Sequence, residues 1–286
     1  MRRVNWQTLG IVALGAVVAA CTSITPPEYW QAFEASLKLD GKLRTDRRPD
    51  DVPFTHSDLS DNFGKTAFGI DPEFVDRMSE EQLNNVDVVR KWVRPIRFAA
   101  YGTITPSDEF VMDGLFDRLR ETTQISIQEE SGGDWNMGIY YFDYAQRETF
   151  LDYLDTSEDA GLHELFSSLF SDDYICSGTL LRRTTDDGVL TGEIDHVFIF
   201  IRAELPSSMR HSCIEEEISQ AMGLIRDDDE VRPSLFNEDE EFALLTEHDE
   251  YLLRILYDPR IRPGAGREEA IPIARRIARE LLPNSI

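Results

Sequence analysis

The chain has 286 residues, and 54 acidic against 29 basic residues give a formal net charge of −25 at pH 7. Such a surface repels phosphate backbones and anionic lipid heads, so we expect no nucleic-acid partner and take the acidity to keep the protein soluble. The length allows one large domain preceded by an arm.

Residues 1–20 have the pattern of an export signal, in which two arginines precede the apolar run Leu9–Ala20. This run is shorter than the roughly 20 residues that span a bilayer. The small residues before Cys21 resemble the lipobox of bacterial lipoproteins. The alternative is ordinary signal-peptide cleavage, in which Cys21 is not modified. The resemblance implies that Cys21 becomes acylated and anchors the protein to a membrane. The residue after it, Thr22, is not Asp, which implies the periplasmic face of the outer membrane.

Residues 21–90 are predicted to form an irregular arm. Apolar residues recur at helical spacing over 27–39, which predicts a short helix. Residues 43–63 are rich in Pro, Asp and Ser and predict extended chain with turns. The aromatic and leucine residues of this stretch favour an arm packed on the main domain over a free linker.

Residues 91–286 form the predicted main domain, in which strands and helices alternate. Strands are predicted over 93–102, 125–127, 137–143 and, as a pair around the turn signal DDG, within 174–201. Helices are predicted over 105–123, 145–154, 161–170, 210–224 and 245–258. This mix predicts an α/β (α+β) domain. The basic segment 267–282 predicts a surface helix, with docking on a membrane as the alternative.

Two cysteines follow Cys21 in the chain, at positions 176 and 213. An even count in an exported chain favours a disulfide between Cys176 and Cys213. On the chain-entropy model, a loop of roughly 38 residues closed by this bond contributes about 4 kcal/mol. Free buried thiols are the alternative, and the lack of a CxxC motif gives no support to a redox role.

The segment Cys213–Leu224, CIEEEISQAMGL, is predicted to be the central helix. An apolar stripe of this helix faces the core (Ile214, Ile218, Ala221 and Met222). Glu216, Gln220 and Gly223 lie on another face, because four residues make slightly more than one turn.

This helix resembles the HExxHxxGxxH segment of metzincin zinc proteases. The resemblance puts Glu216, Gln220 and Arg226 in the three ligand positions and Glu217 in that of the general base. Zinc favours imidazole and thiolate, a glutamine amide is a poor ligand, and Arg226 brings a positive charge toward a dication. We therefore expect no metal and no cofactor, and we lean against an enzyme.

Other interpretations of Glu216, Glu217 and Gln220 remain open. They could form a hydrogen-bonded cluster or a solvated groove, or line a groove that binds an extended peptide without cutting it. A hydrolase that uses Glu217 as general base, with an unconventional metal site, is a further alternative. The side chains of Glu216 and Glu217 diverge by about 100°, so they do not form a carboxylate dyad.

Other polar residues near the helix have simpler explanations. His211 and His248 flank the segment and are expected to be structural hydrogen-bonding groups. Ser219 lies inside the helix without an identifiable triad. The acidic runs 227–230 and 237–241 lack the glycine and terminal glutamate of an EF-hand and predict solvated loops.

The metzincin resemblance continues after the helix. Residues 234–237, SLFN, stand where a metzincin has its methionine turn, with Phe236 in place of Met. Leu245–Asp258 resembles the closing helix of matrixin-like proteases. There, a capping box between Thr246 and Asp249 is expected.

The chain also resembles a family of predicted proteobacterial lipoproteins that is catalogued only as a domain of unknown function. The matching stretches are LRTDRRPDDVPF, RKWVRPIRF, HSCIEEEISQAMGL, SLFN and LTEHDEYLLRILYDPRIRPG. This resemblance spans about residues 40–270 and implies an exported, lipid-anchored protein with a degenerate protease-like domain. We expect a non-catalytic envelope lipoprotein whose groove beside Glu216 and Gln220 binds a peptide or an envelope protein.

Overall fold

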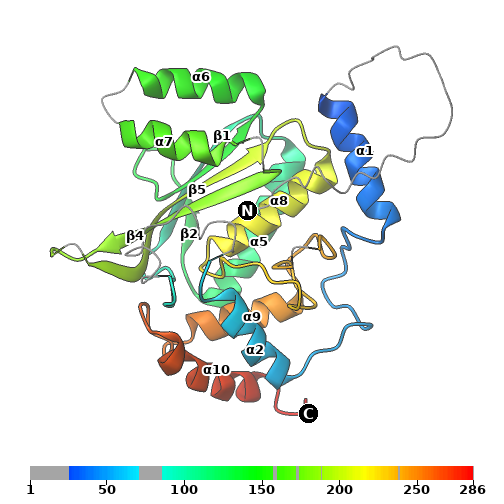
Figure 1. Ribbon diagram of the computed structural model, residues 1–286, viewed down its shortest axis with the longest axis vertical. Helices are drawn as coiled ribbons and strands as arrows, with labels where there is room; N and C mark the ends of the chain where they lie inside the picture. The colour runs from blue at the N-terminus through cyan, green and yellow to red at the C-terminus, as the bar shows by residue number, and fades with distance from the viewer. Residues whose placement is uncertain are drawn as a thin grey trace.

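The computed structural model describes residues 26–70, 86–156, 160–171, 174–187, 189–237 and 239–285. The predicted signal segment 1–20 and the predicted lipidation residue Cys21 lie outside these ranges. Within them the chain forms a five-stranded mixed sheet and eight helices, so the α/β class is confirmed (Figure 1). No helix in these ranges combines the length and the apolar composition needed to cross a bilayer.

The sheet has the strand order β2-β1-β3-β5-β4. Its strands are β1 (Ile96–Gly102), β2 (Ile127–Glu129), β3 (Met137–Phe142), β4 (Cys176–Thr184) and β5 (Leu190–Arg202). β1 pairs in parallel with β2 and β3, and β3 pairs in parallel with β5. β4 runs antiparallel to β5, so the hairpin predicted around DDG is confirmed. The predicted strand 125–127 is displaced by two residues, to Ile127–Glu129.

Two separate apolar layers cover the two faces of the sheet. Side chains alternate along β5, so Ile199 and Ile201 join the main core, whereas Phe198 and Phe200 join a second, aromatic cluster. The aromatic cluster includes residues of α6 (Tyr144–Asp155) and α7 (Ala160–Leu169). The main core receives α5 (Pro106–Thr123), α8 (Ser207–Gln220), α9 (Glu247–Tyr257) and α10 (Arg267–Leu281).

The arm contains α1 (Pro26–Leu39), as predicted, and a second helix, α2 (His56–Thr66). The extended chain predicted over 43–63 is therefore wrong for its last eight residues. Thr55 caps the start of α2 and forms a capping box with Asp58. The helix buries Leu59 and Phe63, but the polar residues between and around them hide the helical spacing of apolar residues in the sequence.

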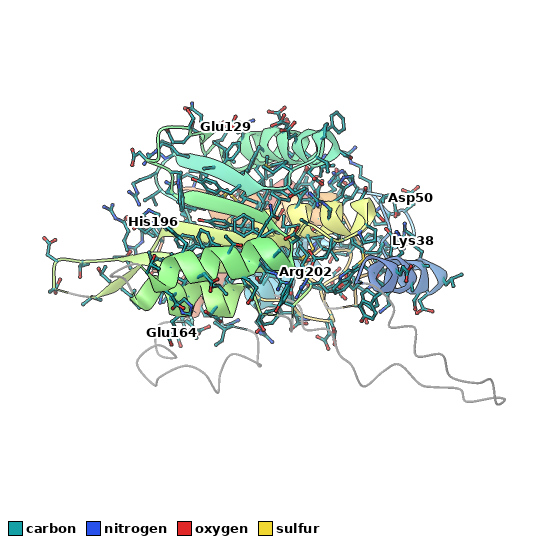
Figure 2. All side chains as sticks on the ribbon, turned by 90° about the horizontal axis from the view of Figure 1, so that it is seen from above. Lys38, Asp50, Glu129, Glu164, His196 and Arg202 are labelled. Carbon is teal, nitrogen blue, oxygen red and sulfur yellow. A yellow bond between two sulfur atoms is a disulfide. The ribbon has the colours of Figure 1, made fainter. Side chains whose placement is uncertain are left out.

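The arm packs on the main domain, as predicted. The backbone N–H of Leu43 donates to the carbonyl of Glu240 (2.8 Å). α2 lies beside α9 and α10 in Figure 1, and its Leu59 and Phe63 belong to the main core. Figure 2 labels Lys38 at the end of α1, where its Nζ donates to Ser208 Oγ of α8 (2.9 Å).

Candidate functional site

Helix α8 carries most of the predicted site and is buried along most of its length. It follows β5 and packs against α5, β4 and β5. Glu216 and Gln220 have only 1% and 7% of their surface exposed, and Glu217 is equally enclosed. The solvated groove that was one interpretation of these residues is therefore wrong, because β4 and the segments that follow α8 cover this face.

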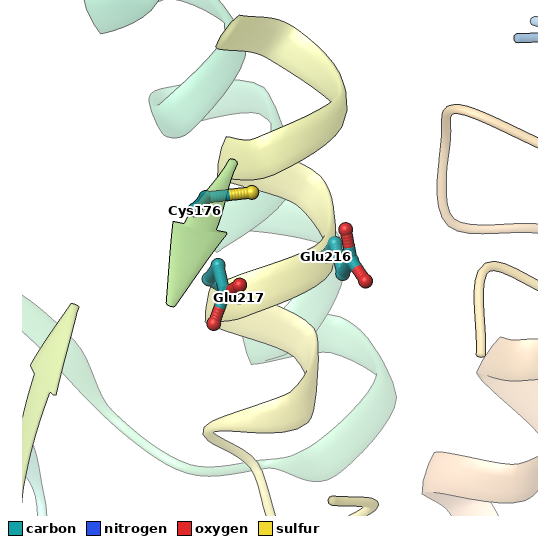
Figure 3. A group of neighbouring side chains, drawn as sticks. All are labelled: Cys176, Glu216 and Glu217. Atoms are coloured by element: carbon teal, nitrogen blue, oxygen red, sulfur yellow. The ribbon is translucent and has the colours of Figure 1, made fainter. Parts of the chain in front are cut away.

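The predicted disulfide between Cys176 and Cys213 is confirmed and connects β4 to α8. Figure 3 shows Cys176 reaching from β4 toward the helix, with the carboxylates of Glu216 and Glu217 leaving the helix in different directions. Ligand atoms of Cys176, Glu216 and Glu217 lie within 4.8 Å of one another. Glu217 Oε2 lies 2.8 Å from where a side chain on Gly178 would begin, so this glycine makes room for the carboxylate against β4.

The other two positions of the zinc-ligand pattern are engaged elsewhere. Gln220 Nε2 donates to Asp227 Oδ1 (2.9 Å), and the Arg226 guanidinium lies 3.4 Å from Asp228 Oδ2. The backbone N–H of Arg226 donates to the carbonyl of Thr66 in α2 (3.2 Å). Both side chains therefore hold the chain after α8 in place.

The acidic runs are less solvated than predicted. Asp227 is buried against Gln220, and Lys65 pairs with Glu230 (2.7 Å). In the second run, Glu241 accepts from Arg232 Nε (2.6 Å). The prediction of solvated loops is therefore wrong for the buried Asp227 and the partly buried Glu241, whereas the side chain of Glu230 is 80% exposed and agrees with it.

Gly223 makes a sharp turn just after the central helix. Its φ is +116°, and a Cβ at this position would lie 2.0 Å from the carbonyl oxygen of Arg90. Both the backbone angle and the close approach therefore require glycine. The helix starts at Ser207 and ends at Gln220, whereas the predicted range was 210–224.

The segment SLFN is held by the first turn of α9. Ser234 Oγ donates to Asp249 Oδ1 (2.5 Å), the Leu235 N–H donates to Asp249 Oδ2 (3.0 Å), and Phe236 is fully buried. The predicted capping box between Thr246 and Asp249 is confirmed. Asp249 therefore joins the turn and the closing helix into one hydrogen-bonded unit.

Glu215 is a structural acid that the sequence analysis did not single out. Its carboxylate receives two hydrogen bonds from the Arg47 guanidinium (2.6 and 3.1 Å) and one from the Leu245 N–H (3.1 Å). This pair fastens the arm to the side of α8 that faces away from the disulfide. The available signal was the first glutamate of the EEE run at 215–217, together with the arginine pair Arg47 and Arg48 of the arm.

A second buried ion pair joins α5 to α8. Arg210 donates through Nε to Asp108 Oδ1 (3.1 Å), and its Nη2 also contacts the carboxylate. Burial opposes ionisation of Asp108, but hydrogen bonds from Arg210 and Thr105 outweigh it and hold the pKa of the carboxyl below its usual value.

Both histidines near the helix contact polar partners. His211 Nε2 lies 3.0 Å from Ser107 Oγ, and burial is the main reason that the pKa of His211 is lowered. His248 is fully buried, with Nε2 3.0 Å from Asn62 Nδ2. These contacts agree with the structural roles expected for them.

An open groove lies on the Glu215 side of α8. Its volume is about 570 Å³, which is within the usual range for ligand sites, about 300–1,000 Å³. We call it the α5–α8 groove. It is lined by α5, the start of α8, the arm and the stretch before α9 (Lys38, Leu43, Thr45, Arg47, Phe110, Val111, Asp113, Gly114, Leu115, Asp117, Arg118, Ser208, His211, Glu215, Ala243 and Leu244). By contrast, the cavity beside Glu216 holds only about 10 Å³.

The model of the family described as "Protein of unknown function (DUF2927)" matches residues 56–276. The chain belongs to this family. The DUF2927 match begins at the first residue of α2 and ends inside α10, so it includes part of the predicted arm as well as α5, α8 and α9. The predicted resemblance to a domain of unknown function is thus confirmed. No curated protein matches the chain.

Proposed function

We propose that this protein is a non-catalytic, lipid-anchored protein of the cell envelope that binds an apolar peptide segment of a partner in the α5–α8 groove. The observation that carries the proposal is Phe110, whose side chain is 81% exposed beside a groove with an apolar floor that includes Val111 and Leu115. A hollow of this size with apolar side chains at its floor and rim is typical of a binding site.

The charge around the groove favours a partner with a basic residue beside its apolar anchor. Arg47 and Arg118 lie at the groove but pair with Glu215 and Glu250. Asp113 is exposed at the rim, and the whole chain carries a net charge of −25. A cationic flank on the peptide would therefore be steered toward the groove.

A degenerate metzincin-like origin of the domain is part of the proposal. It is supported by the sequence of elements, in which a strand, the α8 helix, the turn at Gly223, the SLFN segment and α9 follow one another. The peptide site proposed here differs from the groove expected beside Glu216 and Gln220. The small cavity on that side leaves no room for a peptide chain.

The alternative is a hydrolase in which Glu217 acts as general base. The burial of Glu217 against Gly178 of β4 weighs against it, because a base must reach the proton it removes.

The test uses fluorescent extended peptides that combine an apolar residue with a neighbouring lysine, titrated against the mature chain in a fluorescence anisotropy assay. Phe110→Ala is expected to weaken binding at least about tenfold, which corresponds to about 1.4 kcal/mol. Tyr153→Ala is the matched control, because Tyr153 is an exposed aromatic residue (68%) at a different surface hollow. Equal affinity of wild type and Phe110→Ala would contradict the proposed site.

The same peptides test the alternative function. We expect no cleavage products by mass spectrometry. Cleavage that Glu217→Gln abolishes in a folded protein would overturn the non-catalytic proposal.

Membrane anchoring is tested separately, in cells supplied with labelled palmitate. Incorporation into the wild type and its loss in Cys21→Ala are expected, with release of the variant into the soluble envelope fraction. Equal membrane retention of both proteins would contradict anchoring through Cys21.

A further inference from the structure

Four side chains with metal-binding chemistry meet between β4 and α8. Glu216 and Glu217 follow Cys213 by three and four residues. Both carboxylates therefore lie about one turn after Cys213 and on the same face of α8. Cys176 approaches from β4, and its sulfur lies within 4.8 Å of ligand oxygens of both glutamates (Figure 3). All four residues are at most 2% exposed.

Two thiolates and two carboxylates are a donor set that zinc accepts in tetrahedral sites. Zinc holds sulfur at about 2.3 Å and carboxylate oxygen at about 2.0–2.2 Å, so the donors around it are roughly 3–4 Å apart. The ligand atoms of Cys176, Glu216 and Glu217 lie within 4.8 Å of one another, which is close to this range. Once the two sulfurs separate, changes of side-chain rotamer would suffice to bring the four donors around a zinc ion. The cavity of about 10 Å³ beside Cys176, Cys213 and Glu216 provides some of the space.

In the disulfide state neither sulfur is a thiolate, and thiolates are what a metal ion binds. We propose that reduction of the Cys176–Cys213 disulfide by a dithiol converts these four side chains into a binding site for a zinc ion. The dithiol transfers two electrons and two protons to the disulfide and itself becomes a disulfide. The incoming Zn²⁺ then displaces the two thiol protons, which are released to solvent.

The metal would replace the covalent bond as the connection between β4 and α8. The disulfide and the metal complex are thus alternative states of one cluster, which we call the Cys–Glu cluster (Cys176, Cys213, Glu216 and Glu217). A dication would also offset the cost of placing two carboxylates in a buried position. This inference goes beyond the proposed peptide binding, because the α5–α8 groove lies on the other side of α8.

The experiment uses Co²⁺ as a spectroscopic probe for Zn²⁺ and the mature chain with Cys21→Ser, so that the two cysteines of the cluster are its only thiols. One sample keeps the disulfide. The other is unfolded and refolded under a phosphine reductant, and two free thiols are verified by titration in denaturant. We expect the reduced chain to bind one equivalent of Co²⁺ with the visible bands of a tetrahedral ion and a thiolate charge-transfer band. The oxidised chain should show none of these bands.

Variants then identify the ligands. Glu216→Gln and Glu217→Gln in the reduced chain should each weaken Co²⁺ binding at least about tenfold, and Cys176→Ser should remove the charge-transfer contribution of one sulfur. Gln220→Ala is the control, since Gln220 belongs to the metzincin-like ligand pattern but not to the Cys–Glu cluster. Its Co²⁺ affinity should equal that of the parent chain.

Thermal unfolding gives a second measurement that does not depend on spectra. Zn²⁺ should raise the melting temperature of the reduced chain and leave that of the oxidised chain unchanged. A reduced chain with two verified thiols that binds no Co²⁺ and gains no stability from Zn²⁺ would overturn the inference. So would equal binding by the oxidised chain.

Discussion

The two sides of helix α8 differ in access although they are built from adjacent residues. On the closed side, Cys213, Glu216 and Glu217 lie against β4 and the disulfide, with room for about 10 Å³ of empty space. On the open side, His211 and Glu215 border a groove of about 570 Å³. The spacing of residues along a helix therefore decides which side chains share a face, whereas the neighbouring elements decide which face a ligand can reach.

Two ion pairs between an acid and an arginine connect α8 to other elements. Glu215, on the open side, is paired with a cation of the arm, Arg47. Asp108 is paired with Arg210 at the start of the helix, where α5 and α8 meet. Each pair connects a separate element to α8, so breaking the pairs separately measures how strongly the arm and α5 are each held on this helix.

The largest effect is expected from Asp108→Asn. This change leaves the buried Arg210 guanidinium without its counter-charge, which costs about 3–5 kcal/mol of unfolding free energy. Urea denaturation monitored by circular dichroism measures the loss. Asp113→Asn on the same helix is exposed and should change stability by less than about 0.5 kcal/mol. A loss below about 1 kcal/mol for Asp108→Asn would show that the pair does not hold α5 on α8.

The closed side is tested by removing its covalent bond. Cys176→Ala with Cys213→Ala is expected to lower the unfolding free energy by about 2–4 kcal/mol. Denaturant titrations with and without reductant provide the control, because reductant should destabilise the wild type and leave the double variant unchanged. If reductant affects the double variant equally, the disulfide is not the source of the loss.

The open side is tested by Arg47→Ala, which removes the cation from the buried Glu215 carboxylate. We expect a loss of about 1–3 kcal/mol, together with faster proteolysis of the arm before α2. The neighbouring Arg48 is mostly exposed, and Arg48→Ala should stay within about 0.5 kcal/mol of wild type. Similar proteolysis of both variants would rule out the Arg47–Glu215 pair as the anchor of the arm.

The smallest effect is expected from pH. The pKa of Asp108 is lower in the folded protein than in the unfolded chain, so the unfolded chain binds more protons in acid. The resulting stability is complete above the ordinary pKa of about 3.9 and is lost as pH falls through the lowered folded value. Wild type should therefore lose more stability than Asp108→Asn on acidification, by at most about 1.4 kcal/mol per pH unit. Parallel curves of unfolding free energy against pH for the two proteins would contradict this assignment.

Several features were predictable because local interactions decide them. The capping signals at Thr105 and Thr246, the alternation of β5 and the turn at Gly223 all depend on residues within a few positions of one another. The disulfide followed from the cysteine count and the export expected from the N-terminal segment. Helix α2 was missed because its apolar residues stand among polar ones and become buried only through α9 and α10.

The sequence by itself determined the fold class, most of the strands and helices, the pairing of Cys176 with Cys213 and the spacing of the acids on α8. Only the tertiary structure decided that Glu216 and Glu217 are enclosed, that Glu215 holds the arm, and that the groove lies toward α5. The physical reason is that backbone periodicity is encoded over a few neighbouring residues. Burial and charge pairing depend instead on segments far apart in the chain, and local spacing cannot specify which of them come together.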